Sequence, residues 1–460
     1  MTGVTGAARE RPPVDEARRA AFDVLRAVDT QDAYANLLLP RMLRDRSVSG
    51  RDAAFATELT YGTLRHRGTY DEVIAACSTR PLDALDSDVL DLLRLGCHQL
   101  LSTRVPARAA VDSTVELARS VGRRDVVGFV NAVLRAVSAR TLDQWVDQLA
   151  PADPVQRLAF EYSHPAWVVR ALADALAACG RDDAALTAVL AADNQPPAVS
   201  LVARPGRCEP AELVAAGALP GRWSPYAARW PSGDPGTLRA VREGRAGVQD
   251  EGSQLVALAT VEAPLVGADS RWLDLCAGPG GKAALLDALA AQRPDPGAHV
   301  TAVELLPHRA DLVRSVVTSA TTVEVGDGTD TRWGTGDHDR VLVDVPCSGL
   351  GALRRRPEAR WRRQPADVAA LAGLQRSLLA RAVTAVRPGG VVAYSTCSPH
   401  LAETRSVVED VARRHGDVQV LDARPAFPGV SDLGPGPFVQ LWPDLHGTDA
   451  MFCALLRRSP

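Results

Sequence analysis

Two cysteines follow two apolar segments, each at a point where the chain turns. Cys347 comes directly after the valine-rich run 341–345 and a proline, and Cys397 comes shortly after the apolar run 391–394. Asp344 lies at the end of the first run. Valine-rich runs of this length are typical of buried strands in a parallel sheet, and ligands bind outside the carboxyl ends of such strands. We therefore expect one carboxylate and two thiols at a ligand-binding edge, where a thiolate can act as a nucleophile.

A glycine-rich turn at 276–282 follows another predicted strand and opens a helix. Its glycines let a ligand approach the backbone amides at the helix N-terminus. The sequence of this turn fits neither the nicotinamide fingerprint nor a phosphate loop, because both require a different glycine spacing. A turn that only connects strand to helix would also explain it.

Two acids follow the next predicted strands. Glu304 ends the strand 299–304, where an acid can accept both hydroxyls of a ribose, and Asp327 follows a short strand at 323–325. Taken singly, Glu304 could be an ordinary charge at a helix N-terminus and Asp327 part of a plain turn. Because these residues and the glycine turn follow successive strands, together they indicate one ligand site.

The elements that must position these residues begin near residue 247. From there strands alternate with helices, which indicates an α/β domain with a parallel sheet. Strands are predicted at 271–275, 299–304, 323–325, 341–345 and 391–396, helices at 283–291, 307–318, 366–386 and 403–414, a helix-ending turn at 387–390, and an antiparallel hairpin from 438–442 and 451–456.

The first half of the chain has a different pattern. Residues 15–137 show helical periodicity only, which predicts a small bundle. Arginines gather at its turns, and a solvated surface and an RNA-binding face are both open interpretations. The proline-rich stretch that follows predicts helices at 166–178 and 182–192 and a strand at 198–202. We expect a disordered tail at 1–13, a helical domain at 14–140, an α+β linking module at 141–245 and the α/β domain at 246–460.

The composition of the chain argues against several classes of protein, such as membrane, secreted and metal-binding proteins. The 460 residues are 46% hydrophobic and 23% charged, without a run of 18 apolar residues or the apolar core of a signal peptide, so we expect a cytoplasmic protein and no membrane contact. Its eight cysteines form no Cys-x-x-Cys pair, so we expect no metal. A net charge of −3 means that any nucleic acid would bind to local basic patches.

Three motifs in this order resemble the Nop/Sun (RsmB, Sun or Fmu) family of RNA 5-cytosine methyltransferases. They are Cys-Ala-Gly-Pro-Gly-Gly-Lys at 276–282, Asp-Val-Pro-Cys-Ser-Gly at 344–349 and Ser-Thr-Cys-Ser at 395–398. The resemblance covers about residues 247–458, and residues 15–137 resemble the NusB-like RNA-binding domain of the ribosomal RNA branch. It implies a class I, Rossmann-like methyltransferase sheet preceded by an all-α NusB-like domain.

The resemblance also implies a role for each position. Glu304, where relatives usually have Asp, would take the ribose hydroxyls of S-adenosylmethionine, and Asp327 would lie by the adenine. Asp344 would lie between cofactor and target base. Cys397 would be the nucleophile, and Cys347 would help to release the product. The methionine and ribose side of the cofactor would be held by Cys276, Ala277, Gly278, Pro279, Gly280, Gly281 and Lys282.

These residue types fit the chemistry. Carbon 5 of cytosine is too weak a nucleophile to take a methyl group unaided, but a thiolate that adds at carbon 6 makes it electron-rich. A free thiol has a pKa of about 8.5, so the site must activate it. Asp344 can hold the ring nitrogen and the amino group of the base, and a proton on it can neutralise the ring. The base must leave its stack to enter such a pocket.

Arginines and a tryptophan follow Cys347. Their position beside the active loop predicts a strip that binds the RNA backbone and stacks on a base, although a solvated loop would have the same composition. This predicted strip consists of Arg354, Arg355, Arg356, Arg360 and Trp361.

The sequence thus predicts a monomeric RNA cytosine-5 methyltransferase that uses S-adenosylmethionine, with small-subunit (16S) ribosomal RNA as the substrate that the resemblance implies. A transfer-RNA methyltransferase of the same chemistry is one alternative. A non-catalytic NusB-like RNA-binding or antitermination factor is another, but such a factor would have no use for the two cysteines and the cofactor loop.

Overall fold

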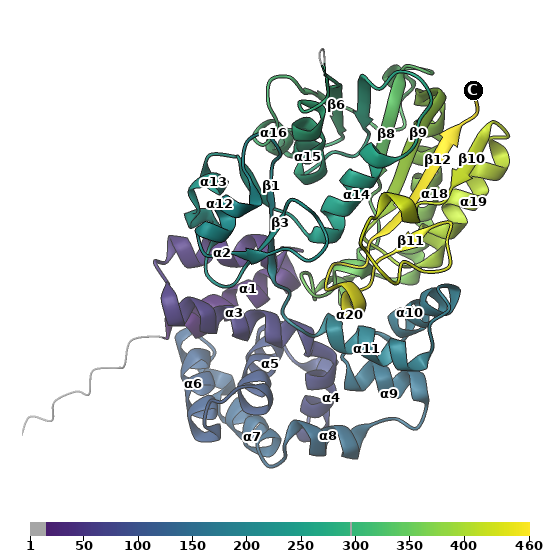
Figure 1. Ribbon diagram of the computed structural model, residues 1–460. Helices are drawn as coiled ribbons and strands as arrows, with labels where there is room; N and C mark the ends of the chain where they lie inside the picture. Colours follow the sequence, from purple (N-terminus) through teal and green to yellow (C-terminus); the bar gives the residue numbers. More distant parts are fainter. Residues whose placement is uncertain (1–14, 295–296) are drawn as a thin grey trace, which may run out of the picture. The chain divides into compact units, whose positions relative to one another are not determined.

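The computed structural model describes residues 15–294 and 297–460 (Figure 1). The predicted tail at residues 1–13 lies outside these residues. The chain divides into two compact units, Met1–Ser163 and His164–Pro460. Within the described ranges, no helix has both the length and the apolar character that a membrane crossing requires.

The first unit is helical, as its periodicity predicts. In α1, Asp15 caps the N-terminus by accepting a hydrogen bond from the Arg18 amide, and the small and apolar side chains of one face are buried. The central helix α5 is buried along most of its length. The helices are α1 (Glu16–Thr30), α2 (Ala35–Asp45), α3 (Gly50–Arg65), α4 (Arg67–Cys77), α5 (Ser87–Ser102), α6 (Ala107–Ser120), α7 (Val127–Val137), α8 (Leu142–Leu149) and α9 (Pro154–Glu161).

The second unit begins with a small α+β part. Four antiparallel strands form a sheet in the order β2-β3-β1-β4. The two helices and the strand that the sequence predicts here are all present. The elements are α10 (Ala166–Ala178), α11 (Asp183–Asp193), β1 (Val199–Ala203), α12 (Pro210–Ala215), β2 (Leu219–Pro220), β3 (Ala227–Trp230), α13 (Arg239–Arg242) and β4 (Ala246–Val248).

A large mixed sheet forms the rest of this unit and confirms the predicted α/β fold. Its strands run in the order β10-β12-β9-β8-β5-β6-β7, where β5 to β9 are parallel and β12 runs antiparallel to both of its neighbours, β9 and β10. The short β11 pairs with β12, which confirms the closing hairpin. The strands are β5 (Arg271–Asp274), β6 (His299–Glu304), β7 (Thr322–Val325), β8 (His338–Asp344), β9 (Val386–Thr396), β10 (Val418–Leu421), β11 (Val439–Gln440) and β12 (Phe452–Arg458).

Helices cover both faces of this sheet (Figure 1). Alternate strand residues pack into two separate cores: Trp272 and Leu342 face the helices α14 and α15, whereas Leu273 and Val341 face α18 and α19. The central strands are therefore buried on both sides, as their apolar runs predict. The helices are α14 (Glu251–Glu262), α15 (Gly281–Ala290), α16 (Pro307–Arg314), α18 (Pro365–Ala385) and α19 (Arg405–Arg414).

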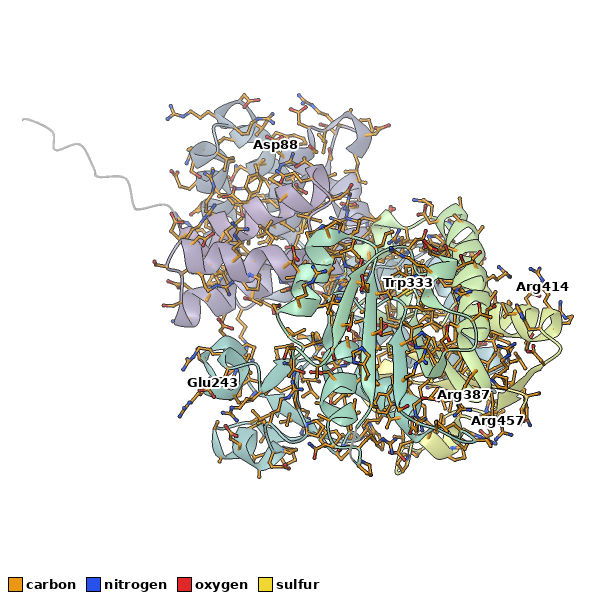
Figure 2. All side chains as sticks on the ribbon, turned by 90° about the horizontal axis from the view of Figure 1, so that it is seen from above. Asp88, Glu243, Trp333, Arg387, Arg414 and Arg457 are labelled. Carbon is orange, nitrogen blue, oxygen red and sulfur yellow. The ribbon has the colours of Figure 1, made fainter. Side chains whose placement is uncertain are left out.

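One strand starts earlier than predicted. The sequence predicts that residues 387–390 end a helix, but they lie within β9, opposite an irregularity in β8. The side chain of Arg387, labelled in Figure 2, holds this segment in place. It donates hydrogen bonds to Asp339 and to the backbone carbonyls of Val266 and Ala268. Residues 387–390 have no partner in the register with β8, and the bonds of Arg387 anchor this segment beside the strand.

Candidate active site

The carboxyl ends of β5, β6, β7, β8 and β9 lie at one edge of the sheet because these strands are parallel. The predicted glycine loop follows β5. Glu304 ends β6, and Asp344 ends β8. Cys397 follows the last residue of β9. The topology thus brings residues that are more than 100 positions apart in sequence to one site.

The two cysteines meet at this edge, with their Sγ atoms 3.3 Å apart. Backbone bonds fasten the two loops to each other: the Val345 amide donates to the Ser395 carbonyl, and the Gly351 amide donates to the Cys397 carbonyl at 2.8 Å. A Cβ on Gly351 would lie 2.3 Å from the carbonyl oxygen of Ala450, so this close approach requires glycine.

The pKa values of the two thiols are shifted in opposite directions. A hydrogen bond from Cys347 lowers the pKa of Cys397, and the positive charges of Arg356 and Lys282 add to this effect against burial and the charge of Asp344. The pKa of Cys347 is raised well above its usual value, because it donates that bond and because it is buried. Cys397 is therefore the sulfur that carries the negative charge more readily, and the thiolate is the nucleophilic form.

Asp344 is held from two sides. Lys282 Nζ donates to Oδ2 at 2.8 Å, and the Ser395 hydroxyl donates to Oδ1 at 2.8 Å. Burial opposes the charge of Lys282, but the nearby carboxylate of Asp344 raises the pKa of the ammonium group overall. Lys282 therefore lies in the predicted cofactor loop and also orients the carboxylate beside the two cysteines. Ser395 opens the motif at 395–398, but its bond to Asp344 depends on the sheet register, which pairs these two residues.

The glycine loop forms a cradle next to Glu304. The Gly278 amide donates to Glu304 Oε2 at 3.1 Å, and a Cβ at residue 278 would lie 2.1 Å from that oxygen. Gly280 has a φ of 113°, which side chains rarely adopt, and it lies at the N-cap of α15. The loop therefore exposes backbone next to a helix N-terminus, which fits a ligand such as S-adenosylmethionine.

Asp274, the last residue of β5, is a site residue that the sequence analysis missed. It is 1% exposed, and its Oδ2 atom has no hydrogen-bond partner among the described residues. Burial raises the pKa of this carboxyl to about 7, and the charges of Asp344 and Glu304 contribute. Asp344 already pairs with Lys282, and Glu304 lies 3.7 Å from Arg309, so Asp274 is the carboxylate that best fits a positively charged group such as the sulfonium or ammonium of S-adenosylmethionine. The available signal is an acid near the carboxyl end of a predicted strand, as for Glu304 and Asp344.

Asp327 follows the end of β7, the strand that pairs with β6. Its carboxylate accepts hydrogen bonds from the amide and the hydroxyl of Thr329, and these bonds lower its pKa. Its backbone carbonyl accepts a bond from the indole of Trp333, which is labelled in Figure 2 and packs into one of the two sheet cores. Because β7 pairs in parallel with β6, this turn lies at the same edge of the sheet as Glu304.

Cys276 lies in the glycine loop, but burial raises its pKa well above the usual value and so keeps it an unreactive thiol.

For two members of the predicted strip, the predicted position on an RNA-binding surface is wrong. Arg354 and Arg360 are 6% and 0% exposed, so neither can contact the RNA backbone from this position. Arg360 donates to the side chain of Asn194 and to the backbone carbonyl of Asp193. Arg354 donates to a backbone carbonyl in the segment between β11 and β12. Oxygen atoms from distant segments, including the carboxylate of Asp449 beside Arg354, thus stabilise these two guanidinium groups in a buried position.

The other members of the strip differ from one another. Arg355 is partly buried and bridges Asp250 and Asp449. Arg356 is exposed, and Trp361 is half-buried. The segment after Cys347 is therefore mainly an anchor that fastens the cysteine loop to the rest of the unit, and only Arg356 and Trp361 keep the predicted surface position.

Comparisons with known proteins agree with this arrangement. The model of the family described as 16S rRNA methyltransferase RsmB/F matches residues 265–457, and the NusB family model matches residues 15–139. The chain is 32% identical over 448 residues to the ribosomal RNA small subunit methyltransferase B of Erwinia tasmaniensis, with 95% of this chain and 97% of that protein covered. The chain belongs to the RsmB/F family of methyltransferases.

Other relatives support this assignment. A Mycobacterium tuberculosis protein that carries a methyltransferase name is 58% identical over 455 residues, covering 97% of this chain and 98% of that protein. Among solved structures, a protein named PH0851 has a TM-score of 0.80 at 20% identity and covers 98% of this chain and 100% of its own, which shows the shared fold. As an RsmB/F family member, the chain is an S-adenosylmethionine-dependent RNA methyltransferase, so the alternative of a non-catalytic NusB-like factor is not supported.

Proposed function

We propose that this enzyme transfers a methyl group from S-adenosylmethionine to carbon 5 of a cytidine in small-subunit ribosomal RNA, through a covalent bond between Cys397 and the base. The observation that carries the proposal is the pair of thiols, 3.3 Å apart, of which Cys397 has the lowered pKa and Cys347 the raised one. Addition to the ring needs one thiolate, and its later departure benefits from a neighbouring donor.

The addition step uses Cys397 and Asp344. The thiolate forms a bond to carbon 6 of the cytosine, and the electron pair of the ring double bond moves toward carbon 5 and the ring nitrogen. A proton carried by Asp344 passes to the ring nitrogen as the adduct forms and returns to Asp344 when the product is released; in between, the carboxylate accepts hydrogen bonds from this N–H and from the amino group of the base. Lys282 and Ser395 hold the carboxylate in position, so that it need not reorganise as the ring gains charge.

S-adenosylmethionine, when bound, supplies the electrophilic methyl group that carbon 5 takes. We assign its binding to the loop 276–282 and to Glu304, Asp327 and Asp274. The cradle at Gly278 and the unpartnered oxygen of Asp274 support this assignment.

The release step uses Cys347. After methylation a base removes the proton from carbon 5, the ring double bond forms again, and the bond between carbon 6 and sulfur breaks with its electrons on Cys397. The thiol of Cys347 donates a hydrogen bond to this leaving sulfur, because its pKa is high and it therefore keeps its proton. Without that donor the departing sulfur would be a poorer leaving group.

Ribosomal RNA is the substrate that the relatives support, since the Erwinia tasmaniensis protein is named for the small ribosomal subunit. Bisulfite sequencing of RNA from a strain that lacks the gene tests this directly. One 5-methylcytosine should disappear from 16S ribosomal RNA, return with the wild-type gene and stay absent with Cys397→Ala. A loss confined to transfer RNA would favour the alternative substrate, and an unchanged set of 5-methylcytosines would contradict the proposed reaction.

A further inference from the structure

A buried carboxylate lies behind the two cysteines and has no part in the chemistry described above. Glu403 is the last residue of the short 3-10 helix η6 (Leu401–Glu403), and it is 0% exposed. Its Oε1 atom accepts from the Ser348 amide at 2.7 Å and from Gln375 Nε2 at 3.2 Å. Its Oε2 atom accepts from the hydroxyls of Ser348 at 2.5 Å and Ser398 at 2.6 Å.

These partners are the immediate neighbours of the two thiols. Ser348 follows Cys347, and Ser398 follows Cys397. The two serine hydroxyls are also 3.1 Å apart. The third partner, Gln375 on α18, donates to the Pro346 carbonyl as well, on the other side of Cys347. One carboxylate therefore connects both cysteine loops and a helix from the sheet face.

Burying the carboxylate of Glu403 costs free energy, because the group loses its contact with water. Within residues 15–294 and 297–460, no ion pair to Glu403 is found, so four neutral donors offset the loss of water around the carboxylate. A carboxylate has about four acceptor positions, and all of them are used. Backbone bonds join the two loops at other positions, from Val345 to Ser395 and from Gly351 to Cys397, whereas Glu403 joins them at the serines that directly follow the two thiols.

We propose that Glu403 is a positioning residue that sets the separation of the two thiols by bridging Ser348 and Ser398. This inference rests on the proposed roles of Cys397 and Cys347. The carboxylate touches neither sulfur, so it acts through the two serines. Its charge has a second consequence, because it contributes to the raised pKa of Cys347 and so helps this thiol to keep the proton that it donates.

Glu403→Gln is the informative variant. The amide keeps the size of the side chain, but one of its two ends donates instead of accepting, so it cannot hold all four donors, and it carries no charge. Misplacement of a reacting group by 1 Å can cost about 100-fold in rate, and we expect a loss in kcat of about this size. The KM for S-adenosylmethionine should change by less than about twofold, because Glu403 contacts no residue of the cofactor loop.

Two further variants complete the design. Glu403→Ala removes all four bonds and should lower kcat further, but it also risks misfolding, for which thermal melting is the check. Glu409→Gln is the matched control, because Glu409 lies on α19 with an exposed side chain that pairs only loosely with Arg405. The control should keep wild-type kcat and melting temperature. A Glu403→Gln enzyme with wild-type kcat would overturn the inference, as would a loss expressed only in KM.

A second measurement separates this inference from the proposed function. In a Cys347→Ala background the protein–RNA conjugate should accumulate, and adding Glu403→Gln should slow its formation about 100-fold, because Cys397 is then displaced from carbon 6. Conjugate formation at an unchanged rate would refute the role of Glu403 while leaving the nucleophile in place. Absence of any conjugate with Glu403 intact would instead refute the proposed function.

Discussion

Arg355 gives a sharp test of whether the arginines after Cys347 anchor the loop or bind RNA. Its Nη2 donates to Asp250 at 2.6 Å and its Nε donates to Asp449 at 2.9 Å. The two carboxylates are only 8% and 9% exposed, so Arg355→Ala removes a cation from two buried charges, of which Asp449 keeps a second cation, Arg354, at 3.6 Å. Breaking a buried pair costs about 3–5 kcal/mol, and the partial exposure of Arg355 places our expectation near the lower value, about 3 kcal/mol.

This free-energy loss should lower the melting temperature by about 5 °C, from an unfolding entropy of about 2.1 cal/mol/K per residue over the unit His164–Pro460. Calorimetry or a dye-based melt measures it. Arg356→Ala is the comparison variant: because this side chain is exposed, the loss of stability should be smaller than for Arg355→Ala, and the negative slope of log RNA affinity against log salt should become less steep by up to about 0.9. An Arg355→Ala enzyme that melts like the wild type but binds RNA more weakly would refute the anchoring role.

Three further predictions concern the site. Iodoacetamide below pH 8 should label Cys397 before Cys347, because the pKa of the first thiol is lowered and that of the second is raised; peptide mass spectrometry checks the order, and the reverse order would move the thiolate to Cys347. The affinity for S-adenosylmethionine, measured by calorimetry, should rise by up to about tenfold as Asp274 ionises around its pKa of about 7, and Asp274→Asn should remove this dependence; a flat wild-type profile would contradict the role of Asp274. Glu304→Ala should weaken the same binding by about 1–3 kcal/mol, and unchanged affinity would take Glu304 out of the cofactor site.

The sheet and the position of the two thiols could be predicted because they depend on local patterns and on one general rule. Apolar runs of strand length identify β8 and β9, and parallel strands must end at the same edge. Asp344, Cys347 and Cys397 all lie within a few residues of those ends. Nothing about their distant partners was needed to bring them together.

The parts that could not be predicted depend on partners that are distant in sequence. Arg354 and Arg360 look like surface residues in a run of arginines, and only the fold supplies the polar groups that allow their burial. Glu403 begins the predicted helix 403–414, where an acid is an ordinary N-terminal charge, but it belongs to η6 and its proposed role depends on serines in two different motifs. In the same way Arg387 allows a strand where Pro and Gly predict a turn.

The covalent role of the two cysteines is the central claim, and denaturing gel electrophoresis of protein incubated with RNA and S-adenosylmethionine tests it most directly. If Cys397 attacks and Cys347 assists release, Cys347→Ala should methylate its substrate and remain attached to it, giving a conjugate that survives denaturation. Cys397→Ala should give neither product nor conjugate. A Cys347→Ala enzyme that turns over normally, or a Cys397→Ala enzyme that accumulates the conjugate, would contradict the assignment.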